Sequence, residues 1–118
     1  MTQSTSTALT VFMLVKTRPE RLGFPVPERF RLLREHVEPI PKAHSERVSL
    51  RFYDTAFYSA RVTGVQVWDA RDHHAYERVA DALRETPFRD RHFDIVEILP
   101  RVENAYASNY GEAALSAN

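Results

Sequence analysis

The spacing of hydrophobic residues along the chain predicts four β-strands. Residues 8–16 are β-branched or aromatic and apolar on both faces of a two-residue period, which is typical of a central strand. Residues 47–54 and 61–69 alternate between apolar and polar side chains, and we expect them to pair as a hairpin. A fourth strand is predicted over residues 93–99, ended by Pro100.

One amphipathic helix is predicted between the first two strands. Apolar residues recur at steps of three and four from Glu28 to Ile40, and arginines and glutamates fill the opposite face. We expect this helix to begin near Pro27. Residues 17–27 hold three prolines and a glycine, a density that favours a connecting loop.

A second amphipathic helix is predicted after the hairpin. Asp69 or Asp72 can cap its first turn, and an apolar stripe that begins at Tyr76 marks its buried side. Pro87 is expected to end its regular part, and residues 88–92 to form one further turn before the last strand.

The order strand, helix, strand, strand, helix, strand predicts an α+β fold of the ferredoxin-like βαββαβ type. In that fold a four-stranded antiparallel sheet carries both helices on one face. We expect residues 8–107 to form this domain, residues 1–7 to be disordered and residues 108–118 to form a C-terminal tail.

The alternation of side chains predicts what each face of the sheet carries. The helix-covered face is expected to hold Val11, Met13, Val15, Val48, Leu50, Phe52, Val65, Val67, Val96 and Ile98. The other face is expected to hold Thr10, Phe12, Leu14, Lys16, Arg51, Tyr53, Gln66, Trp68, Ile95, Glu97 and Leu99. This second face is too apolar to stay in contact with water. We therefore expect a homodimer in which two sheets close into an α/β barrel.

Composition narrows the classes of function. The 118 residues are 43% hydrophobic and 27% charged, as in one ordinary domain. Sixteen basic residues balance sixteen acidic ones, which argues against binding to nucleic acid. Without cysteine there can be no disulfide, zinc–thiolate site or thiol nucleophile. No apolar run is long enough to cross a membrane and the first residues lack the pattern of a signal peptide, so we expect a cytoplasmic protein.

Few residues carry chemistry that stands out in the sequence. The adjacent His73 and His74 point in different directions at the start of a helix, so no metal site is predicted. No glycine-rich loop precedes a helix, and no cofactor is predicted. Asp54 and Asp69 lie at strand ends, where turn formation explains them better than a catalytic pair.

The predicted site lies on the face of the sheet away from the helices. Arg51 and Glu97 are candidates for a covered ion pair, because charges on a covered face are costly unless they are paired. His92, just before the last strand, is expected at the rim of the barrel and could act as a general base. The predicted ligand-binding residues are Phe12, Arg51, Tyr53, Gln66, Trp68, His92 and Glu97. The alternative is that these residues only join the two subunits around a filled interior.

Several short blocks of the chain resemble the darcynin family. These blocks are Val11–Thr17, Arg51–Asp54, Phe57–Arg61, Leu83–Phe88, Val96–Pro100 and Glu103–Ala107. The resemblance spans nearly the whole domain. It implies membership of the dimeric α/β-barrel superfamily and a domain of unknown function.

Three functional hypotheses follow from the residues and the resemblance. The first is a cofactor-independent monooxygenase or isomerase acting on an aromatic or polyketide-like metabolite, with Arg51 stabilising an enolate or phenolate that His92 or Glu97 forms as the base. The second is a non-catalytic metabolite-binding or stress-response protein. The third is a structural homodimer without a ligand. Catalyst and binder need the same pocket, so the sequence does not separate them.

Overall fold

A computed structural model describes residues 8–116, and the segment 1–7, predicted to be disordered, lies outside the described residues. The chain forms one antiparallel sheet of four strands in the order β2-β3-β1-β4. The strands are β1 (Leu9–Thr17), β2 (Val48–Asp54), β3 (Gly64–Ala70) and β4 (Phe93–Arg101). This confirms the predicted ferredoxin-like α+β fold and the β2-β3 hairpin.

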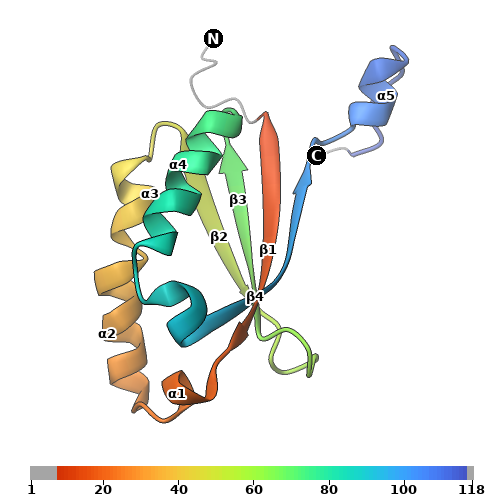
Figure 1. Cartoon of the computed structure of the whole chain (residues 1–118). Coiled ribbons are helices and arrows are strands. Elements are labelled where there is room, and N and C mark those ends of the chain that lie inside the picture. Colours follow the sequence, from red (N-terminus) through yellow and green to blue (C-terminus); the bar gives the residue numbers. More distant parts are fainter. Residues whose placement is uncertain (1–7, 117–118) are drawn as a thin grey trace.

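Helices cover one face of this sheet (Figure 1). The described elements are α1 (Pro19–Leu22), α2 (Val26–His36), α3 (Pro39–Ala43), α4 (His73–Arg84), the π-helical turn η1 (Phe88–His92) and α5 (Ala105–Asn109). Asp72 caps α4 by accepting the Ala75 N–H at 2.7 Å. The second amphipathic helix, its cap and the further turn therefore agree with the sequence pattern.

Several prolines that were expected to interrupt helices or strands lie inside these elements or at their first residue. The predicted loop 17–27 holds the short helix α1 and the start of α2, and the predicted helix 28–40 stops at His36 before α3 begins at Pro39. Pro19 and Pro39 each occupy the first position of a helix, where the missing N–H is not needed. The fourth strand continues through Pro100, because β4 is an edge strand and half of its N–H groups face away from the sheet.

The buried core lies between the sheet and the helices. Val11 and Val15 of β1 are fully buried, as is Val79 of α4. The side chains that pack with them include Leu9, Met13, Val37, Ile40, Val48, Trp68, Leu83, Phe88 and Phe93.

Strand β3 presents the opposite set of side chains from the one predicted. Trp68 pairs with Val11 and with Leu50, so its side chain lies on the helix-covered face. Gln66 shares that face, whereas Val65 and Val67 point away from the helices. Large side chains lie on both faces of β3. The valines were predicted to face the core because they are more hydrophobic than Gln66 and Trp68. The buried indole N–H of Trp68 instead donates to Gln66 Oε1 at 2.9 Å, which satisfies these two polar atoms inside the core, whereas Gln66 Nε2 is buried without a partner.

A β-bulge corrects the prediction for β4. Leu14 pairs with Glu97, but the next residue of β1, Val15, pairs with Ile95, which leaves Val96 as an extra residue. Ile95 therefore packs against the core instead of lying on the uncovered face. Glu97 stays on the uncovered face, as predicted.

The described chain is elongated because α5 lies beyond the end of β4, away from the helices (Figure 1). Its principal extents are 51 × 31 × 22 Å and its radius of gyration is 15.9 Å. A compact chain of this length has a radius of gyration of about 13.5 Å. The predicted tail boundary between residues 107 and 108 falls within α5.

Candidate functional site

The sheet face away from the helices, here called the open face, brings together side chains from all four strands. In one row across the sheet Ser49, Asp69, Thr10 and Arg101 are neighbours. In the next row of the same face Arg51, Val67, Phe12 and Leu99 are neighbours, followed by Tyr53, Val65, Leu14 and Glu97. The middle of this face is apolar and its margins are charged.

A hollow of about 620 Å³ lies at the end of the open face where β4 leads toward α5. Its walls include Thr10 and Phe12 of β1, Arg51, Asp69 and Arg101. Glu103 and Asn104, from the segment that joins β4 to α5, line it from the other side. Its volume is within the range of about 300–1,000 Å³ that is typical of small-molecule sites. We call it the open-face hollow.

Asp69 organises the polar side of this hollow. The Thr10 hydroxyl donates to Asp69 Oδ1 at 2.7 Å, and Arg51 Nη2 donates to Asp69 Oδ2 at 3.3 Å. Both carboxylate oxygens thus have a partner. The Arg51 side chain is 60% exposed and Asp69 uses one of its amino groups, so further guanidinium N–H groups are left for a ligand.

Arg101 and Phe12 form the aromatic side of the hollow. The Arg101 guanidinium carbon lies 3.7 Å from the centre of the Phe12 ring, a cation–π contact. Among the described residues no carboxylate lies within ion-pair distance of Arg101. Its charge is therefore available to a ligand that stacks beside it.

The seven predicted ligand-binding residues divide into three groups. Phe12 and Arg51 line the hollow. Tyr53 and Glu97 lie on the open face but one row beyond Phe12 and Arg51. Gln66, Trp68 and His92 are buried on the helix side, with exposed fractions of 0%, 0% and 6%.

The predicted Arg51–Glu97 ion pair does not form within one chain. Arg51 lies on β2 and Glu97 on β4, the two edges of the sheet, with β3 and β1 between them. That places their two strands about 14 Å apart. Arg51 pairs with Asp69 instead. Asp54 and Asp69, at the two ends of the hairpin, also remain apart.

His92 lies in a closed corner between η1 and α2 instead of at a barrel rim. Its Nδ1 atom is buried without a hydrogen-bond partner, and Phe24 contacts its ring edge-on at 5.9 Å between ring centres. Burial lowers the pKa of His92, and the nearby Arg21 lowers it further. The space beside the ring is about 10 Å³, room for about one water molecule.

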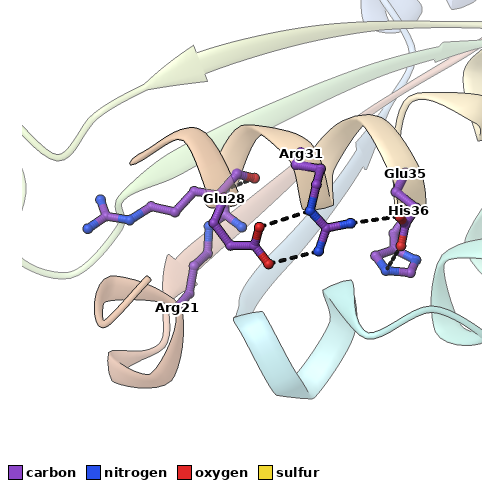
Figure 2. Close-up of polar contacts among 6 residues, drawn as sticks. Arg21, Glu28, Arg31, Glu35 and His36 are labelled. Carbon is purple, nitrogen blue, oxygen red and sulfur yellow. Dashed lines mark hydrogen bonds and ion pairs between the residues drawn. The ribbon is translucent and has the colours of Figure 1, made fainter. Parts of the chain in front are cut away.

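The outer surface of α2 carries an ion-pair network that explains its charged face. Arg31 lies between Glu28 and Glu35 and donates to both carboxylates at 2.7–2.8 Å (Figure 2). Hydrogen bonds from Arg31 lower the pKa of the Glu28 carboxyl, and both glutamates raise the pKa of Arg31. These side chains are largely solvent-exposed, so the network belongs to the helix surface and not to a binding site.

The hollow contains five polar residues that were not among the predicted ligand-binding residues, namely Thr10, Asp69, Arg101, Glu103 and Asn104. Thr10 was placed on the correct face, but Asp69 was assigned to a turn or a helix cap, and Arg101 was placed beyond the end of the last predicted strand. The row Asp69, Thr10, Arg101 depends on the register of three strands, and strand alternation alone does not define that register. In residues 8–116, no group of three metal-ligating side chains is close enough to hold a metal ion. Likewise, no helix of that range is long and apolar enough to span a membrane.

Comparisons with known proteins agree with this fold. The family model described as "Darcynin, domain of unknown function" matches residues 1–118. A "Darcynin homolog" of Granulibacter bethesdensis is 62% identical over 110 residues, which cover 93% of this chain and 89% of that protein. A second "Darcynin homolog", from Streptomyces avermitilis, is 54% identical over 110 residues, covering 93% of this chain and 91% of that protein.

Among solved structures the similarity is one of fold. Chlorite dismutase from Candidatus Nitrospira defluvii, in complex with imidazole, matches with a TM-score of 0.71 and 17% identity over 85% of this chain and 42% of that one. A heme-binding protein from Thermus thermophilus matches with a TM-score of 0.73 and 11% identity over 89% of this chain and 44% of that one. The chain thus spans less than half the length of these two proteins.

Proposed function

The chain belongs to the darcynin family, whose domain has no assigned function, and we propose that it is a homodimeric protein that binds a planar organic acid in the open-face hollow. The observation that carries the proposal is the convergence of Arg51, Arg101 and Phe12 on one hollow of about 620 Å³. Two guanidinium groups and an aromatic ring suit a flat conjugated molecule with a carboxylate or phenolate group.

Each residue has a distinct part in the proposed binding. Asp69, held by Thr10, fixes the Arg51 guanidinium, whose remaining N–H groups donate to the acidic group of the ligand. Arg101 lies over the ring of Phe12, so the ring system of the ligand stacks on the free side of its guanidinium. Glu103 also lines the hollow and disfavours ligands that carry several negative charges.

The proposed homodimer covers the open face. Phe12, Leu14, Val65 and Leu99 are only partly buried there, and Tyr53 is 50% exposed. A second copy of the same face would remove this apolar surface from water. The two solved proteins named above support this arrangement, because each chain is more than twice as long as the matched part and can hold two such units.

Binding is better supported than catalysis. The first hypothesis needed a base beside Arg51, but His92 lies on the other side of the sheet. Asp69 already accepts hydrogen bonds at both oxygens, and Glu97 lies a row away from Phe12 and Arg51. A monooxygenase or isomerase reaction at this hollow would therefore depend on Glu97 reaching the ligand in the assembled dimer.

The described residues do not fit a heme, although one of the structural neighbours is a heme-binding protein. His92, the one buried histidine in the described chain, adjoins a space of about 10 Å³, far too small for a porphyrin. The open-face hollow is large enough but has no histidine in its wall. We therefore assign no step to heme.

Calorimetric titration of the full-length protein with 2-naphthoate tests the proposal. We expect saturable binding of one ligand per hollow, and binding at least tenfold weaker for the Arg51→Ala and Arg101→Ala variants. Such a loss corresponds to about 1.4 kcal/mol or more, as for a hydrogen bond to a charged group. Arg61→Ala, in the exposed loop between β2 and β3, is the matched control. Equal affinity for 2-naphthamide would show that the acidic group is not recognised.

No binding across a panel of planar acids would favour the structural homodimer without a ligand. If 2-naphthoate binds equally well to wild type and to both arginine variants, the ligand lies elsewhere and the assignment to this hollow is wrong.

A further inference from the structure

The segment that follows β4 forms a folded hook, here called the α5 arm (residues 102–116). Asn104, at the start of α5, has φ 55° and ψ 28°, in the left-handed region, and its Oδ1 accepts the backbone N–H groups of Leu115 and Ser116 at 3.0 and 3.2 Å. Gly111 has φ 67° at the end of the helix, where the Glu112 N–H donates to the Ala107 carbonyl at 2.8 Å. Internal hydrogen bonds thus define the shape of the arm.

The outer surface of this hook is apolar and uncovered. Tyr106 and Tyr110 are 77% and 71% exposed, and their rings contact each other at 5.2 Å between centres. Leu115 is 89% exposed. The arm lies away from the body of the protein, beyond the end of β4 (Figure 1). An ordered apolar surface that its own chain does not bury is typical of a segment that packs against a partner.

The open face alone is small for a stable dimer interface. Four strands of about seven residues present an area of about 20 Å by 24 Å, or about 500 Å² per subunit. Two such faces bury about 1,000 Å², whereas stable interfaces bury about 1,200–2,000 Å². The missing area is of the size that two α5 arms can supply.

We propose that the α5 arms are exchanged in the dimer, so that Tyr106 and Tyr110 of each subunit cover the open-face hollow of its partner. Charge favours this placement, because residues 105–116 of the arm carry Glu112 and no lysine or arginine, whereas Arg101 of the hollow has no carboxylate partner among the described residues. The ligand site is then complete only in the dimer, with walls from one subunit and a cover from the other. This inference rests on the homodimer of the proposed function.

Cysteine cross-linking tests the exchange directly, because the chain has no native cysteine. A tagged Tyr110→Cys protein is mixed with untagged Ser49→Cys protein, whose substituted residue is exposed and lies in the open-face row of Asp69. We expect a disulfide-linked heterodimer to form at least tenfold faster than with Glu77→Cys, an exposed position on α4 on the helix side. Equal rates for the two partners would overturn the exchange.

Substitution of the exposed tyrosines distinguishes an error in the proposed arm exchange from an error in the proposed homodimer. Tyr106→Ala combined with Tyr110→Ala should raise the dimer dissociation constant at least a hundredfold and weaken 2-naphthoate binding. The control is Phe57→Ala combined with Tyr58→Ala, an aromatic pair that is 84% and 92% exposed at the opposite end of the sheet, and it should change neither. An unchanged dimer in the tyrosine variant overturns the exchange and leaves the proposed function intact. A wild-type protein that is monomeric at micromolar concentration overturns both.

Discussion

At the residue scale, Trp68 makes the interior of the protein observable, since it is the only tryptophan in the chain. Its ring is fully buried under the helices and its N–H donates to Gln66. We predict blue-shifted fluorescence that resists quenching by iodide and that does not change when a ligand binds on the open face. Emission typical of water in the folded protein would contradict this placement.

His92 makes stability depend on pH. Because burial, and then Arg21, lower its folded-state pKa below the ordinary 6.5, the unfolded chain binds more protons as the pH falls through that value. Stability should therefore be complete above about pH 7 and decline on acidification, until the pH falls below the folded-state pKa.

Thermal melts from pH 5 to 8 measure this effect. His92→Gln should flatten the decline below pH 6.5, because the glutamine does not titrate. His73→Gln, exposed at the start of α4, is the control and should keep the wild-type slope. Parallel curves for wild type and His92→Gln would exclude His92 as the cause.

The position of each site residue was harder to predict than its residue type. The face of Arg51 was predicted correctly because its strand alternates between apolar and polar side chains, and the face of Phe12 because the polar Thr10 and Lys16 share its parity. The face of Trp68 and Gln66 was predicted wrongly, because the valines Val65 and Val67 are the more hydrophobic set of the same strand. Which set faces the core depends on the register of β3 against Val11 and Leu50 on the neighbouring strands. Asp69 was interpreted as a turn or capping residue, because its hydrogen-bond partners Thr10 and Arg51 come from two other strands.

At the scale of single elements, the helices show which signals in a sequence are dependable. The cap and apolar stripe of α4 predicted its position, because both act within a few residues of chain. The prolines predicted less well, since Pro19 and Pro39 begin helices and Pro100 lies in an edge strand. A proline excludes only a local hydrogen bond, and the fold determines whether that bond is needed.

The cap of α4 gives a prediction at this scale. Asp72→Ala removes the acceptor for the Ala75 N–H and should lower the free energy of unfolding by about 1 kcal/mol. Asp81→Ala, on the exposed side of the same helix, should change it by less than about 0.5 kcal/mol. Urea denaturation of the two variants measures the difference. Equal effects would mean that the cap contributes little to stability.

At the scale of the whole molecule, the open face governs assembly. We predict that light scattering gives twice the chain mass of 13.7 kDa for wild type. Leu14→Glu should yield a monomer, because it places an unpaired carboxylate in the middle of the buried interface. The Trp68 emission should remain blue-shifted in that monomer, which distinguishes dissociation from unfolding. A folded dimer of Leu14→Glu would show that the subunits meet through another surface.

The bulge at Val96 has a consequence for how β4 can change by mutation. Because Val96 is the extra residue between Ile95 and Glu97, it re-phases the strand, so that Phe93 and Ile95 pack inside while Glu97 and Leu99 face outward. Loss of that single codon would remove the bulge and leave Ile95 opposite Val15 and Phe93 opposite Thr17, so both side chains would stay in the core. The gene should therefore tolerate the loss of codon 96, whereas the loss of codon 94, in the regular part of the strand, would turn Phe93 out of the core.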